Sequence, residues 1–372
     1  LLAYSSVENI GIILLGVGLT MFFLSKNEPY LAVFSLIAGL YHLVNHAIFK
    51  GLLFLCSGSI YKASGTRNIE KLGGLIKNMP QTSVYFLIGA MGISALPPLN
   101  GFVSEWLTLQ AFFLGAFKTV GGTKIFLAIC ASLLALTSGL AAACFVKAFG
   151  VTFLAKPRSR HAEEAKEVSF SMKFGMLFLS ILTVIFGLAA VLIIGLLTKV
   201  AGASLGIDTD SMNFSLNNFI LSPQAGKNVY LSTPILAAAL AILGVVAFVI
   251  YKFSSKEKTV TYNTWDCGYY KLDARNEYTS TAFSKPFRIA FNFFLRPYHN
   301  TQKIRESFYH VKSFTYETHT TKVFNKHIYE PVLALILRIA NSMKKIQPGS
   351  IHLYLSYIFL TLLALIMFMG RF

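Results

Sequence analysis

Three titratable side chains interrupt an otherwise apolar stretch, AGLYHLVNHAIFKGLLFLCSG, at residues 38–58. His42, His46 and Lys50 follow one another at four-residue intervals. In a helix they would form a column on one face, with neighbours about 6 Å apart. Imidazole exchanges protons at its ring nitrogens, and a lysine without water can titrate near neutral pH. The spacing therefore predicts proton transfer; the alternative is two core histidines and a lysine that extends to a membrane surface.

A candidate carboxylate follows an interruption in a second apolar stretch. Pro97 and Pro98, in ALPPLNGFVSEW, each lack a backbone donor and stop an α-helix. This predicts two half-helices, 81–96 and 102–116, and a break whose backbone groups need protein or water as partners. Glu105 lies early in the second half-helix, where the helix dipole favours negative charge. We expect hydration and a functional carboxylate there; the alternative is a helix cap at a membrane surface.

The remaining candidates for chemistry are weaker. Lys147, in AAACFVKAFGVTFL, lies near the end of an apolar run, where it can serve a proton path or extend to the surface. Glu8, in YSSVENIG, also lies near an end of its run. Asp266 and Cys267, in TWDCGY, are too few for a metal site and predict a packed loop. No CxxC pair is present, and the sequence predicts neither a metal nor a cofactor.

Composition places these groups in a membrane. The chain has 372 residues, of which 55% are hydrophobic and 13% charged, and its mean hydropathy is +0.60. Soluble domains carry about twice that charged fraction. Apolar runs of the length that crosses a bilayer cover residues 8–24, 33–61, 125–153, 174–198, 233–252 and 351–370. With the broken stretch, the predicted fold is an all-α polytopic membrane protein of about seven transmembrane crossings.

The formal net charge of +17 lies in loops between apolar runs, which leaves no polar domain to bind nucleic acid. Loop 62–79 has four basic residues and one acidic residue. Loop 155–173 has five basic and three acidic residues, and segment 253–350 has fifteen basic and seven acidic residues. If the broken stretch crosses once, all three lie on one side, which the positive-inside rule makes cytoplasmic. The sequence therefore predicts a multi-pass protein of the cell inner membrane, in contact with the lipid bilayer.

Residues 298–345 have the pattern of a long amphipathic helix that lies along a surface. Apolar residues such as Phe308, Val311 and Phe314 recur every three or four positions, with basic residues between them. Pro331 should bend or divide this lateral helix. The alternative is a loose cytoplasmic domain.

Several strings resemble the proton-translocating, antiporter-like membrane subunits of complex I and its relatives. These are LLAYSSVENIGIILLG, HLVNHAIFKGLLFLCSGSIY, GTRNIEKLGGL and ALPPLNGFVSEW, all before about residue 155. FVKAFGVTFLAKPRS and TWDCGYYKLDARNEYTSTAFSKPF are similar to the large membrane subunit of hydrogenase 4 and formate hydrogenlyase. That branch is also similar to Mrp-type sodium/proton antiporter subunits.

The resemblance implies roles for single residues. His42 and His46 match the family's bridging histidines, Lys50 its central lysine, and Glu105 its proton-exchange residue after the broken helix. The family's N-terminal half has no counterpart here, so we expect an N-terminally truncated sequence. The resemblance implies four domains. Residues 1–155 would form the C-terminal part of a proton-channel domain, and residues 156–252 additional transmembrane helices. Residues 253–350 would form a cytoplasmic-side loop with the lateral helix, and residues 351–372 a terminal anchor.

The leading interpretation is a proton-translocating membrane subunit of a respiratory or energy-converting oxidoreductase complex, either of the hydrogenase 4/formate hydrogenlyase kind or NADH dehydrogenase-like. Because the sequence has no redox motif, we expect the redox chemistry to lie in partners. These would be other membrane subunits and a peripheral redox arm, a nickel–iron hydrogenase with iron–sulfur subunits. The alternatives are an Mrp-type sodium/proton antiporter subunit and a structural membrane strap without transport.

Overall fold

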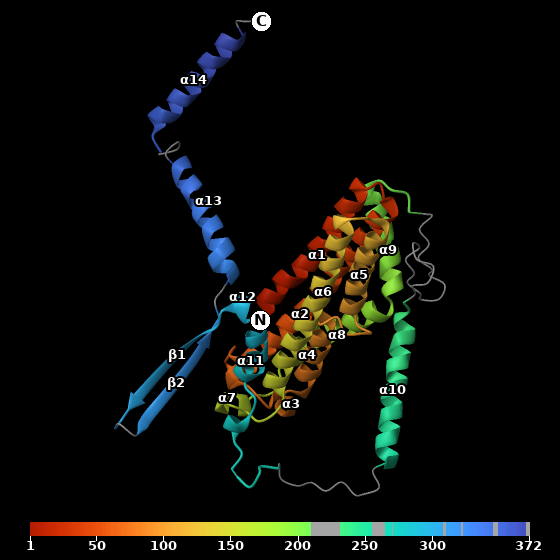
Figure 1. Ribbon diagram of the computed structural model, residues 1–372, viewed down its shortest axis with the longest axis vertical. Helices are drawn as coiled ribbons and strands as arrows, with labels where there is room; N and C mark the ends of the chain where they lie inside the picture. The colour runs from red at the N-terminus through yellow and green to blue at the C-terminus, as the bar shows by residue number, and fades with distance from the viewer. Residues whose placement is uncertain are drawn as a thin grey trace. The chain divides into compact units, whose positions relative to one another are not determined.

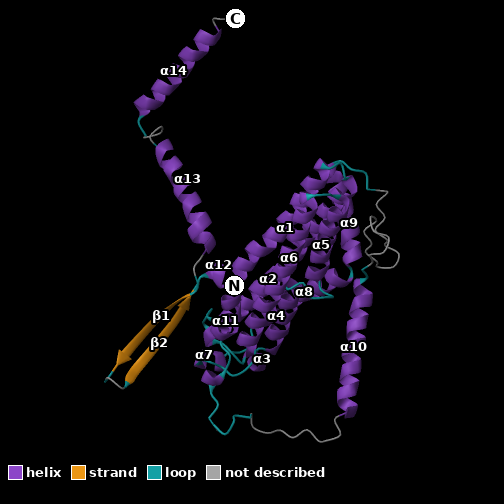
Figure 2. Cartoon of the chain, viewed as in Figure 1, coloured by secondary structure: helices purple, strands orange, loops and turns teal. Residues whose placement is uncertain are grey.

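The computed structural model describes residues 1–209, 231–254, 265–269, 271–307, 310–320, 323–344 and 349–369 (Figure 1, Figure 2). The chain forms two units, Leu1–Phe283 and Ser284–Phe372. Six helices among the described residues are long and apolar enough to cross a membrane: α1 (Leu2–Ser25), α2 (Pro29–Ser64), α6 (Gly122–Phe153), α8 (Phe170–Leu188), α10 (Thr233–Ser254) and α14 (Ile351–Met369). The prediction of a polytopic all-α membrane protein is confirmed.

Helices α1 and α2 are joined by a short turn and pack against each other through two glycines. A Cβ atom on Gly16 would lie only 2.7 Å from the Cα atom of Gly39. Small residues let membrane helices approach closely, so this crossing has no room for a side chain. The close packing brings polar residues near the start of α1 against the middle of α2.

The predicted break is present and divides one crossing into α4 (Pro80–Ile93) and α5 (Asn100–Lys118). The two half-helices follow one another along the bundle (Figure 1). Between them the backbone makes turn bonds, such as that from Ala95 N to Gly92 O at 3.2 Å. The break falls at the two prolines, as expected for residues that cannot donate to a helix.

A second interruption lies in the predicted span 174–198, where α8 ends and α9 (Ala190–Leu205) begins after a single residue. That residue, Ala189, has φ −98° and ψ 27°, outside the helical range. Gly187 packs on the first break, because a Cβ atom there would lie 2.4 Å from the carbonyl oxygen of Pro98. The two interruptions are therefore in contact, and the predicted span 174–198 consists of parts of two helices, α8 and α9.

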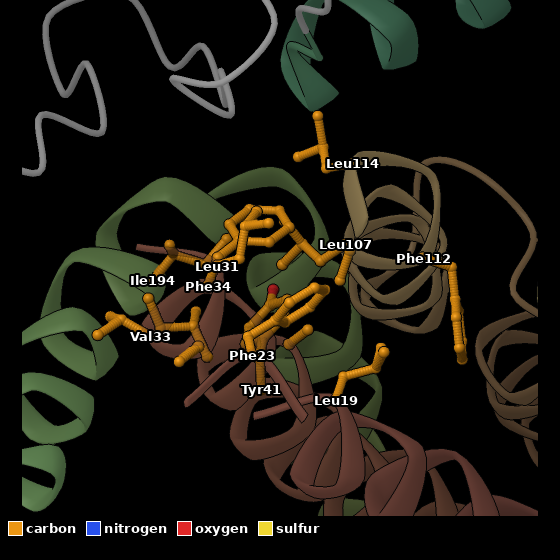
Figure 3. Packing of buried hydrophobic residues seen from close by; sticks show 14 of the residues in the cluster. Leu19, Phe23, Leu31, Val33, Phe34, Tyr41, Leu107, Phe112, Leu114 and Ile194 are labelled. Atoms are coloured by element: carbon orange, nitrogen blue, oxygen red, sulfur yellow. The ribbon is translucent and has the colours of Figure 1, made fainter. Parts of the chain in front are cut away.

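Large apolar side chains from α1, α2, α5, α6 and α9 fill the interior of the first unit (Figure 3). Phe23, Phe34 and Tyr41 are at most 1% exposed. The hydroxyl of Tyr41 donates to the carbonyl oxygen of Phe186, near the end of α8. This bond gives a partner to a backbone group beside the second interruption, where the helical ladder ends.

Three polar segments meet at one end of this unit. Arg158 donates to the carbonyl oxygen of Leu72 at 2.9 Å and forms an ion pair with Glu277 at 3.4 Å. The carboxylate of Glu70 accepts from the backbone nitrogen of Thr281 at 2.7 Å. The loops before α4 and after α6 therefore lie at the same end, so α4 and α5 together cross once, as the charge count predicts. Short helices here are α3 (Leu75–Asn78), α7 (Arg160–Glu163) and two 3-10 turns, Ile69–Lys71 and Ala274–Asn276.

The second unit corrects the predicted lateral helix over 298–345. Strands β1 (Tyr298–Arg305) and β2 (Val311–His319) form an antiparallel hairpin. Helical structure follows only afterwards, in a π-turn (Asn325–Tyr329) and in α13 (Glu330–Met343). The short helices α11 (Ser280–Ala290) and α12 (Asn292–Leu295) precede the hairpin.

The hairpin forms because residues 311–319, VKSFTYETH, alternate with a period of two and include β-branched and aromatic side chains. Phe314 and Tyr316 share one face, with Lys303 of the partner strand 5.4 Å from the ring of Phe314. Pro331 lies in the first turn of α13, directly after the π-turn, where proline needs no helical donor. The amphipathic helical pattern was therefore correct for α13 and wrong for the segment before it.

Candidate proton-transfer site

His42 is buried in the middle of α2, with 1% of its surface exposed. Its Nδ1 atom lies 2.9 Å from Oγ of Ser104, in the second turn of α5. Its Nε2 atom lies 3.2 Å from Oδ1 of Asn9, on α1. Three helices therefore meet at one imidazole, and both ring nitrogens have partners from other helices.

Lys50 is 5% exposed and lies two turns farther along α2. Its ammonium group donates to Oγ of Ser5, on α1, at 2.5 Å. The same group lies 6.0 Å from the ring centroid of Phe54, within the range of a cation–π contact. Its charge also interacts with the carboxylate of Glu8, one turn after Ser5. Lys50 thus points into the bundle and does not extend to the membrane surface.

His46 lies between the other two on α2 and is half-buried. Its ring meets that of Phe49 edge-on, with centroids 5.7 Å apart. Its Nε2 atom is buried without a hydrogen-bond partner. Because a buried polar atom without a bond is costly, this nitrogen is suited to accept a proton or bind a water molecule. His46 also interacts electrostatically with His42 and Lys50.

Glu105 is 6% exposed, in the second turn of α5. Its carboxylate accepts a hydrogen bond from the hydroxyl of Ser138, on α6. The residue is therefore inside the bundle, and the alternative of a cap at a membrane surface is wrong. Its charge interacts with that of Glu8, which also interacts with Lys50. Glu8, a weak candidate by sequence, thus interacts electrostatically with both Lys50 and Glu105.

Lys147 is half-buried on α6. It interacts electrostatically with Cys144, one turn before it, and Cys144 interacts in turn with Lys50 and Glu8. Its part in proton transfer stays a prediction.

The break beside His42 is lined with polar groups. Asn45 donates through Nδ2 to the carbonyl oxygen of Asn100 at 2.9 Å. Both side chains are fully buried, and Oδ1 of Asn45 and Nδ2 of Asn100 have no hydrogen-bond partner. One free acceptor and one free donor make this a place where a water molecule can bind, consistent with the hydration expected at the break.

Within the described ranges of the chain, no group of three or more His, Cys, Asp or Glu residues could hold a metal ion. At the predicted packed loop, Asp266 accepts from the backbone nitrogen of Gly268 at 2.9 Å, and Cys267 is exposed. This loop is separate from the cluster around His42.

Sequence reasoning missed the neutral partners of the titratable groups, which are Ser5, Asn9, Ser104 and Ser138. A signal was present for two of them. Ser5 and Asn9 are four residues apart in an apolar run, the same spacing that marked His42 and His46. Polar residues on one face of an apolar helix predict a polar neighbour, although they do not say which.

Comparison with known proteins gives matches over different parts of the chain. Residues 1–135 match the family described as "NADH:quinone oxidoreductase/Mrp antiporter, TM". The chain is 36% identical to hydrogenase-4 component B of Escherichia coli K12 over 375 residues, which cover 98% of this chain and 54% of that protein. It is 35% identical to formate hydrogenlyase subunit 3 of the same strain over 294 residues, 78% of this chain and 45% of that protein. The chain therefore spans about half the length of these relatives.

A solved structure shares the fold. It is a chain of the membrane-bound sulfane sulfur reductase, an archaeal respiratory membrane complex, with a TM-score of 0.61 and 20% identity. The superposition covers 97% of this chain and 55% of that chain. The match to the NADH:quinone oxidoreductase/Mrp antiporter family therefore covers residues 1–135, and the similarity to hydrogenase-4 component B extends over nearly all of the chain.

Proposed function

We propose that the chain is a proton-translocating membrane subunit of an energy-converting oxidoreductase complex of the hydrogenase 4 or formate hydrogenlyase kind. One observation carries this proposal: Lys50, His42 and Glu105 are buried around a broken crossing, with His46 among them. Ionisable groups inside a membrane are costly and mark ion pathways. The names of the two Escherichia coli relatives support the type of complex.

In the proposed mechanism a proton passes among Lys50, His46, His42 and Glu105, with water molecules in the gaps. A redox event in a partner changes the charge on one group, and repulsion then moves the proton on the next. The proposed partners are other membrane subunits and a peripheral redox arm, for which we propose a nickel–iron hydrogenase with iron–sulfur subunits; the relatives' names support a hydrogenase or formate hydrogenlyase complex. We place the chain in the cell inner membrane, with the end that carries Glu70 and Arg158 in the cytoplasm.

The proposal predicts that Lys50→Met and Glu105→Gln each abolish proton pumping while the complex still assembles. Neither neutral side chain can carry the proton onward. Pumping is measured in inverted membrane vesicles by quenching of a pH-sensitive dye after addition of the electron donor, and assembly on native gels. Lys118→Met is the matched control, because this lysine pairs with Glu28 at an exposed position. Wild-type pumping by both Lys50→Met and Glu105→Gln would refute the proposal.

Exchange of sodium against protons is a second candidate, favoured by the family description, which includes Mrp antiporters. It predicts that a sodium gradient alone drives proton movement in the same vesicles. Proton movement that needs the electron donor and ignores sodium would exclude this candidate.

A further inference from the structure

His42 is held by an amide whose own bonds determine where the imidazole hydrogen lies. Asn9 donates through Nδ2 to the carbonyl oxygen of Ser5 at 2.8 Å. Because a carbonyl oxygen only accepts, the amide nitrogen must face Ser5 and the amide oxygen must face His42. That oxygen also only accepts, and it lies 3.2 Å from Nε2. Nε2 therefore carries a hydrogen whenever this bond is made.

Nδ1 of His42 is then the position that can gain or lose a proton. It lies 2.9 Å from Oγ of Ser104, a hydroxyl that donates or accepts according to its rotation. While His42 is neutral, Ser104 donates to Nδ1. Once His42 holds a second proton, Nδ1–H donates to Ser104, and the hydroxyl hydrogen must turn to another acceptor.

The alternative acceptors of Ser104 belong to the backbone of the broken crossing. Its Oγ lies 3.1 Å from the carbonyl oxygen of Gly101 and 3.4 Å from that of Asn100. The Asn100 oxygen already accepts from Asn45 at 2.9 Å, so Gly101 is the better acceptor. Gly101 lies in the first turn of α5, and Glu105 directly follows Ser104. The hydroxyl thus links the charge on His42 to the half-helix that carries Glu105.

We infer that Ser104 is a proton-linked hydroxyl switch for His42, and that Asn9 fixes the imidazole tautomer on which the switch depends. Both act as positioning residues, because neither gains or loses a proton in the cycle. The imidazole takes up one proton and later releases it, while Ser104 keeps its own hydrogen and only changes its acceptor. The inference rests on the proposed function, since a histidine that never changes charge has no use for a switch.

The test compares Ser104→Ala, which removes the hydroxyl, with Ser104→Thr, which keeps it. We expect Ser104→Ala to lower proton pumping by about 10-fold or more in fully assembled complex, and Ser104→Thr to retain it. Ser35→Ala is the matched control: Ser35 is also fully buried, and its hydroxyl bonds only its own helix, at Leu31 O, 2.8 Å away. Wild-type pumping by Ser104→Ala, or equal loss in Ser104→Thr, overturns the switch.

A double variant tests whether Asn9 and Ser104 act through the same histidine. Asn9→Leu should also lower pumping, and Asn9→Leu with Ser104→Ala should lose no more than the worse single variant. Losses that multiply would show two independent effects and overturn the inference. Lys50→Met and Glu105→Gln in the same preparation separate the proposed function from the switch. Normal pumping by both refutes the proposed function, whereas loss of pumping in both together with normal pumping by Ser104→Ala refutes only the switch.

Discussion

The groups around Lys50 stabilise its positive charge only weakly. Its ammonium group donates to the neutral hydroxyl of Ser5, faces the ring of Phe54 and interacts with the carboxylate of Glu8. A carboxylate in direct contact would strongly favour the charged form of a buried lysine, because opposite charges stabilise each other there. A neutral hydroxyl partner favours the charged form less, which suits a group whose proton must leave within each cycle.

Glu8 offers a prediction at the scale of the single residue. Glu8→Gln should slow proton pumping by about 10-fold or more, because the carboxylate interacts with both Lys50 and Glu105 and an amide cannot take a proton. The dye assay in inverted vesicles measures this. Glu28→Gln is the control: its pair with Lys118 is partly exposed, at 32% and 43%, and worth about 1 kcal/mol or less. Unchanged pumping in Glu8→Gln would exclude Glu8 from the path.

The titratable residues of the site could be predicted, and their partners could not. Each of His42, Lys50 and Glu105 is conspicuous against its apolar neighbours, and the cost of burying charge makes that signal strong. Asn9 and Ser104 become important only through the packing of α1 and α5 on α2. That packing depends on contacts between residues far apart in the chain, which no local pattern contains.

At the scale of elements, the two helix interruptions have different physical causes. The break between α4 and α5 follows from Pro97 and Pro98, whose missing donors act locally. The interruption at Ala189 has no proline, and it lies where Gly187 and the carbonyl oxygen of Phe186 contact other parts of the bundle. Tertiary contacts determine this second interruption. The hydropathy of 174–198 does not record such contacts, so it indicated only a single apolar span.

The crossing of α1 and α2 gives a prediction at this scale. Gly16→Ala should lower the stability of the protein in detergent by about 1–3 kcal/mol, because its methyl group would overlap the backbone at Gly39. Thermal unfolding of the purified protein measures the change. Gly18→Ala is the control on the same helix, since a Cβ atom there meets nothing within 4 Å. Equal stability of the two variants would show that the crossing can relax.

At the scale of the whole molecule, counting charges in loops predicted which segments share an end. The bonds from Arg158 to Leu72 and Glu277, and from Thr281 to Glu70, confirm that grouping. The hairpin was missed for a different reason. Apolar residues in 298–319 fit the spacing of a helix loosely and the alternation of a strand more closely. Three- and four-residue spacing alone does not distinguish a helix from a strand here.

Glu70 provides the prediction for this end of the first unit. Glu70→Ala should release residues 271–283, because its carboxylate accepts from Ser280 N at 3.2 Å, Thr281 N at 2.7 Å and Thr281 Oγ1 at 2.6 Å. Hydrogen–deuterium exchange of peptides from this segment should rise. Glu164→Ala is the control, since its pair with Arg160 is exposed and lies within one turn. Unchanged exchange would mean that other contacts, such as those of Arg158 and Lys156 with Glu277, hold the segment without Glu70.

The four-residue spacing of the column on α2 also has an electrical consequence. Eight residues of helix separate Lys50 from His42, about 12 Å along the axis. If α2 runs along the membrane normal, this is roughly 40% of a hydrocarbon layer ~30 Å thick. A proton that moves between the two residues therefore crosses a large part of the membrane potential, worth roughly 0.9 kcal/mol per 100 mV. The membrane potential either opposes or favours this proton movement, depending on its direction. The rate of this step should therefore change with the membrane potential.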